Sequence, residues 1–407
     1  MTSEMPLSQN RIRELIQVYR DGLLNDVLPF WMNQAVDDQY GGIMTSLDRD
    51  GTIIDTDKGV WQQGRFAWLL GELYNDPRLA NHPERERWLE TAGRTLDFIS
   101  THCFDSSDGR MWFHVTRDGR PIRKRRYAFS ESFAAIAYGE FSQATGKSEY
   151  AQQAKNCFSR FVDHNLNPVG TEPKFTDVRP SQGIGFPMIS IATAQQLRGS
   201  IDLENAGALI DRSVELIRTT FMKSDIRCVM ETVGPAGEMI DHFDGRTLNP
   251  GHAIEGAWFM MEEGKYRSDP GLIQTGLDML DWMWERGWDS QHGGLCYFVD
   301  VKGLPVQEYW HDMKFWWPHN ELIIATLFAY QLTGKSKYAE QHQLAHDWAY
   351  QHFPDPKHGE WYGYLHRDGS PSSHLKGNLW KGPFHLPRMQ HVSWQLLEEL
   401  SDTPENN

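Results

Sequence analysis

Two histidines in the 407-residue chain share one local setting, the first turn of a mostly apolar segment with helical spacing. His252 follows a Pro-Gly break in NPGHAIEG (249–256), and His385 follows a Gly-Pro break in KGPFHLPR (381–388). Glu255 comes three residues after His252, so these two side chains share one helical face. An imidazole beside a carboxylate can act as a general base that its neighbour orients. The alternative is a histidine that only caps its helix.

An arginine and a tryptophan–glutamate pair could take part in the same chemistry. Arg65 lies early in KGVWQQGRFAWLL (58–70), a helical stretch that is otherwise rich in apolar residues. Because burial of an unpaired guanidinium is costly, we expect Arg65 to meet an oxygen-rich ligand or a glutamate. In KFWWPHNE (314–321), Trp317 and Glu321 are four residues apart and share a helical face. A core tryptophan with a first-turn glutamate is the alternative for this pair.

Two opposed imidazoles, an arginine and several tryptophans suit proton abstraction from a carbon next to a carbonyl. One imidazole would remove the proton, the arginine would stabilise the enediolate oxygen, and the second imidazole would return a proton from the other face. Such a site inverts a stereocentre and needs no metal or redox cofactor. His342 and His346 are spaced as a metal pair, but no third ligand is in view, so we expect them on a solvated helix face.

Turn glycines recur at a nearly constant interval in the elements that must position these residues. The spacings between them are 68, 118, 66 and 66 residues, and the long interval is close to two periods, with a degenerate turn near 176–183. Helical stretches alternate with these hairpin-like turns, so the sequence predicts about six helical pairs. The turn glycines are Gly51, Gly119, Gly237, Gly303 and Gly369.

Six helical pairs can close into a ring. We therefore predict an all-α (α/α)6 toroid with short β-hairpins at one end and a single domain over residues 1–407, the last few of them disordered. An open solenoid has similar local periodicity, so the repeat supports the helical pairs more strongly than it supports closure. In a ring, units four and six carry His252 and His385, which could then face each other across a central funnel.

Composition narrows the classes of protein and partner. The formal net charge of -15 argues against nucleic acid and anionic membranes, and the basic run at 123–126 is too short to reverse this. The chain has no stretch of 18 apolar residues and no apolar signal-peptide core near residue 1, and its four cysteines lack disulfide or zinc spacing. We expect a cytoplasmic protein that binds a small molecule, and its 16 tryptophans fit a protein that stacks sugar rings.

Motifs along nearly the whole chain resemble the N-acylglucosamine 2-epimerase family, whose mammalian members are also called renin-binding proteins. Besides the motifs already quoted, these are FSESF (129–133), WDSQHGGLCYFVDVKG (288–303) and GEWYGYLHRDG (359–369). The resemblance implies an (α/α)6 barrel, usually a homodimer, that interconverts sugars at C2 through an enediolate. It also implies that His252 and His385 are the acid/base pair and that Arg65 is the essential arginine.

The resemblance further implies which side chains contact the sugar or orient the histidines. It suggests that no cofactor is required and that ATP could act as an activator at a glycine-rich hairpin near Gly41 and Gly42. The same glycine spacing recurs at 294–303, which favours a repeated hairpin turn instead. No metal ligand set is expected. The expected substrate-binding residues are Glu255, Trp317, Glu321, Trp380, Lys314 and Glu131.

Two departures from the family bear on the substrate. Relatives that act on free aldoses or cellobiose carry an extra pocket histidine in a mid-chain helix. This chain has Met188 and no histidine in that region, which is closer to the acylglucosamine epimerases. The segment HLKGNLWKGPFH (374–385) inserts residues beside His385, Trp380 among them, which leaves the need for an N-acetyl group open.

Our leading hypothesis is a 2-epimerase that interconverts N-acetylglucosamine and N-acetylmannosamine, or a closely related aldose pair. The alternative is an aldose–ketose isomerase acting on a free hexose such as mannose. Two other classes predict different behaviour. A glycoside hydrolase on the same toroid would depend on paired carboxylates, and a protein-binding module would turn over no sugar.

Overall fold

Helices of two kinds alternate along the chain, and their burial explains the two layers of the structure. We describe a computed structural model that covers residues 7–168 and 174–402. Helix α12 (Trp316–Thr333) is buried on every face from its first residue to Tyr330, as expected for a helix surrounded by protein. Helix α1 (Gln9–Gly22) buries only Ile12, Leu15 and Tyr19, which form the single apolar stripe of an outer helix.

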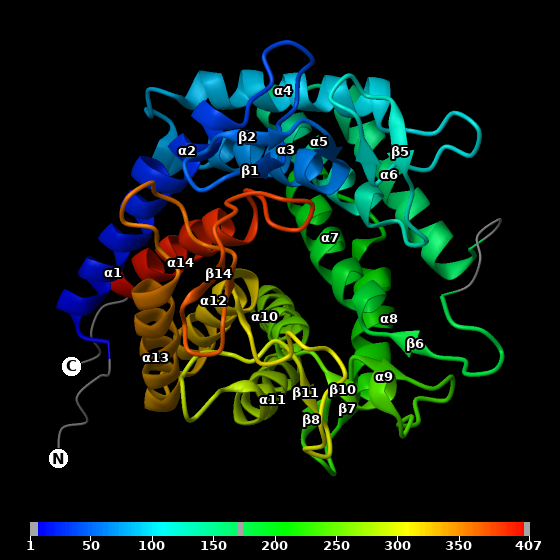
Figure 1. Ribbon diagram of the computed structural model, residues 1–407, viewed down its shortest axis with the longest axis vertical. Coiled ribbons are helices and arrows are strands. Elements are labelled where there is room, and N and C mark those ends of the chain that lie inside the picture. Colours follow the sequence, from blue (N-terminus) through cyan, green and yellow to red (C-terminus); the bar gives the residue numbers. More distant parts are fainter. Residues whose placement is uncertain (1–6, 169–173, 403–407) are drawn as a thin grey trace.

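Inner helices line the centre of the structure and outer helices surround them (Figure 1). The inner helices are α3 (Val60–Asn75), α5 (Phe129–Thr145), α7 (Gly185–Ile201), α10 (Pro250–Arg267), α12 and α14 (His385–Asp402). The outer layer consists of α1 with its π-helical continuation η1 (Leu23–Val27) and α2 (Leu28–Gln34), then α4 (Arg85–His102), α6 (Ser148–Leu166), α8 (Ala206–Leu216) with η3 (Ile217–Phe221), α11 (Pro270–Gly287) and α13 (Ser336–His352). Two short helices, η2 (Pro77–Leu79) and α9 (Phe243–Arg246), lie in connections.

Short antiparallel strands join each outer helix to the next inner helix. Three of the expected hairpins form, β1–β2, β4–β5 and β13–β14, and their turn glycines Gly51, Gly119 and Gly369 have φ of 88°, 89° and 86°. The strands are β1 (Ser46–Leu47), β2 (Ile53–Asp55), β3 (Lys58–Gly59), β4 (His114–Val115), β5 (Pro121–Arg123), β6 (Gln182–Gly183), β7 (Met222–Lys223), β8 (Cys228–Val229), β9 (Thr232–Val233), β10 (Thr247–Leu248), β11 (Val299–Asp300), β12 (Lys314–Phe315), β13 (Tyr364–Leu365) and β14 (Pro371–Ser373).

The turns at Gly237 and Gly303 differ from the sequence expectation. Both glycines have positive φ, but β9 pairs with β6 and β11 pairs with β10, so neither turn closes a hairpin of two paired strands. The reason is that each strand pairs with the strand that precedes the neighbouring inner helix. A local turn pattern therefore predicted the turns but not the partner of the strand.

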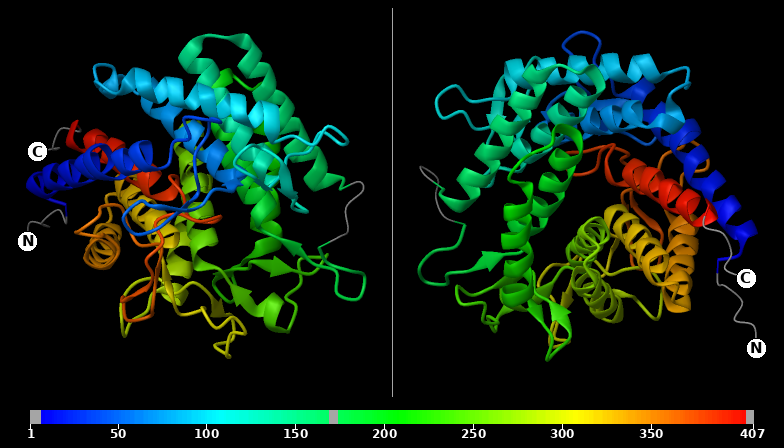
Figure 2. Two further views of the ribbon diagram at one scale, coloured as in Figure 1. Left: turned by 45° about the horizontal axis from the view of Figure 1, so that its top comes forward. Right: turned by 180° about the vertical axis from the view of Figure 1, so that it is seen from behind.

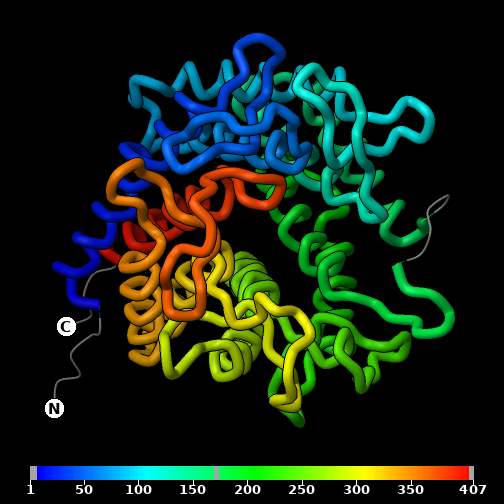
Figure 3. Tube along the Cα trace, viewed as in Figure 1, coloured from blue at the N-terminus to red at the C-terminus, as the bar shows by residue number. Residues whose placement is uncertain are grey.

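The ring is closed between its first and last units, and the (α/α)6 toroid is confirmed. Helix α14 returns beside α1, so the first and last helices lie on the same side of the ring (Figures 2 and 3). The Leu47 backbone pairs with Gly377, and the Arg49 guanidinium binds the buried Asp355 carboxylate through bonds of 2.7 and 2.9 Å. Closure thus depends on contacts more than 300 residues apart in sequence.

Two details of the outer layer complete the fold. His342 and His346 are buried, which corrects the expected solvated face, because the Tyr19 hydroxyl of α1 bonds both rings at 3.1 and 2.8 Å. Their metal-like spacing thus serves a hydrogen-bonded contact between two outer helices. None of the helices within 7–168 and 174–402 is long and apolar enough to cross a membrane.

Candidate active site

A cavity of about 1710 Å³ occupies the centre of the ring. The structure brings His252, His385 and Arg65 to its wall, although they come from the fourth, sixth and first inner helices. Glu255 and Trp317 line the same cavity. The residues that sequence reasoning grouped by chemistry therefore meet in one place.

His252 lies in the first turn of α10, where the Asn249 side chain caps the helix by accepting a bond of 3.2 Å from the His252 backbone N–H. Its ring atom Nδ1 lies 3.1 Å from both carboxylate oxygens of Glu231. Burial by itself lowers the pKa of His252, but the Glu231 carboxylate outweighs it and raises that pKa above the ordinary value. The Glu231 carboxylate therefore stabilises the imidazolium form of His252.

His385 is the first residue of α14, and its Nδ1 donates to Glu321 Oε1 over 2.7 Å. Burial and the nearby Arg388 guanidinium hold the pKa of His385 well below its ordinary value. The ring is therefore neutral at pH 7. Because Nδ1 carries the proton that bonds Glu321, the second ring nitrogen, Nε2, offers a free lone pair.

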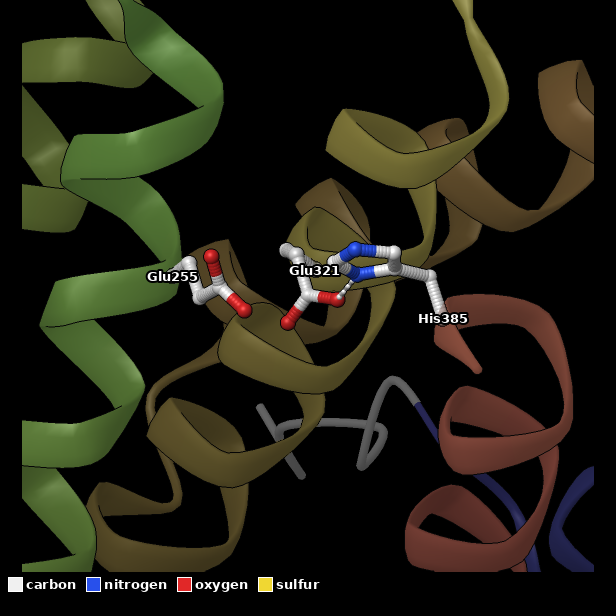
Figure 4. Close-up of side chains that lie close together, drawn as sticks. All are labelled: Glu255, Glu321 and His385. Atoms are coloured by element: carbon white, nitrogen blue, oxygen red, sulfur yellow. Dashed lines mark hydrogen bonds and ion pairs between the residues drawn. The ribbon is translucent and has the colours of Figure 1, made fainter. Parts of the chain in front are cut away.

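Arg388 links two carboxylates near His385, those of Glu255 and Glu321, which Figure 4 shows beside the imidazole. Its Nη2 atom lies 2.6 Å from Glu255 Oε1 and 2.6 Å from Glu321 Oε1, and Glu321 also accepts from Trp258 Nε1 at 2.8 Å. Ligand atoms of Glu255, Glu321 and His385 lie within 4.8 Å of one another, which is the spacing of a cation site. The Arg388 guanidinium already supplies the positive charge there, so the fit for a metal ion is poor.

Arg65 is buried in α3 and stacks on aromatic rings. Its guanidinium carbon lies 4.1 Å from the ring centre of Phe133 and 4.7 Å from that of Phe384, and its Nε is buried without a hydrogen-bond partner. No carboxylate within 7–168 and 174–402 forms an ion pair with it. Burial lowers the pKa of Arg65 to about 9. A buried and unpaired guanidinium at a cavity wall is ready to bind an anionic oxygen.

Two tryptophans shape the cavity. The Trp317 ring centre lies 5.1 Å from that of His252 and 5.6 Å from that of His385, so one indole contacts both imidazoles. Trp380 is 45% exposed and lines the cavity, with the Arg125 guanidinium 4.9 Å from its ring centre. The two rings offer flat apolar surfaces of the kind that pack against sugar rings.

The structure does not bring Lys314 and Glu131 to the cavity, although both were expected to contact the sugar. Lys314 is a fully buried residue of β12, and its Nζ binds Asp289 Oδ2 at 3.1 Å. Glu131 is 1% exposed and accepts a bond of 2.8 Å from the Met111 backbone N–H. Each carries a charge whose partner lies within the protein, so both side chains support local structure.

Sequence reasoning named Glu321, which bonds His385, but missed Glu231 beside His252 and Arg388 beside Glu321. Glu255 was expected to contact the sugar or orient the histidines. It binds Arg388, and the carboxylate that bonds His252 is Glu231, from the segment between β8 and β9. Arg388 was visible in KGPFHLPR but had no assigned role. Its position three residues after His385 matches that of Glu255 after His252, which is the one local signal that could have pointed to it.

The glycine-rich turn at Gly41 and Gly42 is a structural repeat. Its φ angles, 79° and 71°, match those of Gly293 and Gly294, 71° and 70°. The Gln63 side chain packs against Gly42 and accepts a bond of 2.7 Å from the Ile43 backbone N–H. The Gln63 side chain therefore packs against this turn, and the matching φ angles support its interpretation as a recurring hairpin element.

The fold and the site define an (α/α)6-barrel protein with a two-histidine centre in its funnel. Residues 41–385 match the N-acylglucosamine 2-epimerase family, and the chain is 33% identical over 399 residues to the N-acylglucosamine 2-epimerase of Bos taurus, with 95% of this chain and 93% of that protein covered. The chain belongs to the N-acylglucosamine 2-epimerase family.

Solved structures agree on the fold. The cellobiose 2-epimerase from Spirochaeta thermophila DSM 6192 matches with a TM-score of 0.82 at 18% identity, over 98% of this chain and 100% of that one. A D-mannose isomerase matches with a TM-score of 0.77 at 16% identity, over 96% and 98% of the two chains. At these identities the likeness defines the toroid and leaves the substrate open.

Proposed function

We propose that the protein is a sugar 2-epimerase that interconverts N-acetylglucosamine and N-acetylmannosamine, or a closely related aldose pair. The observation that carries this proposal is the pair of cavity-lining imidazoles that both contact Trp317, each held at Nδ1 by its own carboxylate. One carboxylate for each histidine leaves both Nε2 atoms available for proton transfer. Family membership supports the same reaction class.

The two histidines would start in different protonation states. Neutral His385 removes the C2 proton of the open-chain sugar through Nε2, and the electron pair moves through the C1 carbonyl to oxygen. Protonated His252 then delivers a proton to the opposite face of C2, which inverts the centre. After turnover the proton has moved from His252 to His385. The reverse reaction therefore begins from the state in which the forward reaction ends.

Arg65 would stabilise the oxygen on which negative charge develops. Its unpaired guanidinium lies in a buried, aromatic-lined wall, where an ionic contact is stronger than in water. Because no carboxylate in the described residues competes for it, Arg65 can give its charge to the intermediate. Glu255, Trp317, Glu321 and Trp380 would hold the sugar or the histidines, and the scheme requires no cofactor.

The test is a screen in deuterated water followed by NMR. The protein is incubated with N-acetylglucosamine, N-acetylmannosamine, glucose, mannose and cellobiose, and products are identified. The proposal predicts an epimer with deuterium at C2. A ketose as the main product would replace the epimerase by an aldose–ketose isomerase, and release of a sugar from cellobiose would indicate a hydrolase.

We further propose a cytoplasmic homodimer in which ATP is at most an activator. The four cysteines are free, three of them buried, which fits a reducing compartment. Light scattering of the purified protein tests the dimer, since a monomeric mass would reject it. Turnover measured with and without ATP tests activation, and equal rates would reject a role for the nucleotide.

A further inference from the structure

The segment from Lys376 to Phe384 leads into His385 and is longer than the equivalent connections in the first and fifth units. In the first and fifth units, a buried lysine (Lys58 and Lys314) precedes the inner helix by two residues. In the sixth unit, Lys376 occupies the corresponding place, because its Nζ binds the Gly359 carbonyl and the Asp355 carboxylate as Lys58 binds Gly41 and Asp37. Helix α14 begins nine residues later, so this connection carries an insertion.

A second buried lysine lies within this insertion and has its own partner. Lys381 is fully buried, and its Nζ binds the Glu360 carboxylate and, at 3.0 Å, the Lys376 carbonyl oxygen. Lys381 directly follows Trp380 and precedes His385 by four residues. The Glu360–Lys381 pair therefore anchors the insertion at a point between Trp380 and His385, which both line the cavity.

Glu360 occupies a position that favours glycine. Its φ is +54°, in the left-handed region, where a side chain with a Cβ is strained. The Asp355 N–H bonds the Glu360 carbonyl, and the same backbone bond joins Asp37 to Gly42 and Asp289 to Gly294. At both of those places the residue is glycine with positive φ. Backbone strain at a residue that bears a buried carboxylate suggests a function for that carboxylate.

The insertion is also tied to the helix that carries Arg65. The buried Gln62 side chain donates to the carbonyl oxygens of Leu379 and Trp380 at 3.4 and 3.1 Å. Gln62 lies three residues before Arg65 on α3. Since α3 and α14 belong to the first and last units, these noncovalent contacts set the distance between Arg65 and His385.

We infer that the buried Glu360–Lys381 pair positions His385 and Trp380 at the cavity, a role that rests on the proposed epimerase function. Neither residue lines the cavity, so both are positioning residues. The carboxylate of the strained Glu360 neutralises Lys381, which anchors the inserted segment. A change in this pair should therefore affect the step at His385 more than the step at His252.

The test replaces both partners in the variant Glu360→Gly/Lys381→Met. Glycine relieves the strain and methionine fills the space of the lysine stem, so no charge is left buried alone, and the variant should fold. We expect a thermal midpoint within a few degrees of wild type and a loss of at least about tenfold in kcat/KM for epimerisation in both directions. His252 deprotonates one of the two epimers. The rate at which that epimer exchanges its C2 hydrogen for deuterium should fall less than about threefold.

The matched control is Asp105→Asn/Lys124→Met, which removes a lysine–carboxylate pair of 2.6 Å before α5, a helix that carries neither histidine. It should stay within about twofold of wild type. A milder variant, Glu360→Gln, keeps the backbone strain and should show the same selective loss if the double variant does not fold. Unchanged epimerisation, or a parallel fall of epimerisation and exchange, would overturn the inference. Absence of both reactions in the wild-type protein would reject the epimerase function itself.

Discussion

His252 and His385 occupy equivalent places in two repeats, yet their surroundings differ in charge and exposure. The His252 side chain is 33% exposed and bonds one carboxylate, Glu231, which forms no ion pair with an arginine within residues 7–168 and 174–402. The His385 side chain is 10% exposed, and its carboxylate, Glu321, is shared with Arg388. One pKa is therefore raised and the other lowered. The comparison teaches that a repeat can supply two copies of one imidazole site, while the neighbours make one an acid and the other a base.

The largest effect is expected from removing either imidazole. His252→Asn and His385→Asn should each lower epimerisation by about a thousandfold or more, because each removes one of two proton-transfer groups. Each variant should still exchange the C2 hydrogen of one epimer in deuterated water. Exchange through His385, in His252→Asn, should persist to low pH, whereas exchange through His252 should rise as pH rises through its raised pKa.

NMR of the C2 hydrogen over a pH series measures both exchange reactions. The exposed hairpin residue His366 provides a matched control, and His366→Gln should leave both rates unchanged. If the two variants exchanged the same epimer, or shared one pH dependence, the opposed acid and base roles would be wrong.

Arg65 forms no hydrogen bond with either histidine, and its replacement should cause the next largest loss of activity. Arg65→Met should lower kcat by about 10²–10³-fold, because it removes a preorganised cation from the developing oxyanion. The thermal midpoint should stay the same or rise by a few degrees, since burial of this unpaired guanidinium opposes folding. Enzyme kinetics and calorimetry measure the two effects. A variant that kept more than a tenth of wild-type kcat would contradict the role.

Glu231 tests the cause of the raised pKa at His252. In wild type, activity should fall as pH rises through the pKa of His252, because the acid is lost, and should fall at low pH as His385 becomes protonated. Glu231→Gln should move the upper limb to lower pH and lower kcat at pH 8, because the carboxylate that raises the pKa of His252 is removed. A pH profile of kcat/KM measures the shift. Glu238→Gln, an exposed neighbour, should leave the upper limb in place, and an unmoved limb in Glu231→Gln would exclude the carboxylate as the cause.

Lys314 should show the smallest effect on activity, because it contacts neither imidazole and does not reach the cavity. Lys314→Met should cost about 3 kcal/mol of stability, since Asp289 loses a buried partner, and should leave KM within about twofold. Chemical denaturation and steady-state kinetics separate the two. A tenfold rise in KM at unchanged stability would restore Lys314 as a sugar contact.

Much of the fold follows from local rules that a sequence displays. The five turn glycines have φ between 73° and 89°, a conformation in which glycine is favoured, so their spacing reports the repeat directly. The helical starts of α10 and α14 are set by Pro-Gly and Gly-Pro breaks, which is why His252 and His385 could be placed in equivalent first turns. Arg65 could be singled out because a cation in an apolar helix is costly.

Local sequence patterns could not predict the contacts between distant segments of the chain. His342 and His346 have the spacing of a polar surface pair, and Tyr19, more than 320 residues away, makes them a buried contact. Lys314 and Glu131 lie in motifs that match the family, yet Lys314 binds Asp289 and Glu131 accepts from the Met111 backbone, and neither lines the cavity. A charge in a sequence does not show which opposite charge will meet it.

The sequence by itself determined the helical repeat, the two histidines and the arginine, because spacing, chain breaks and residue chemistry act within a few residues. Only the tertiary structure decided that Glu231 serves His252 and that Arg388 joins Glu255 to Glu321. The tertiary structure also decided that a strained Glu360 meets Lys381. These pairings set the protonation and position of the two imidazoles. They depend on the closed ring, because electrostatic interactions follow distance in space and not separation along the chain.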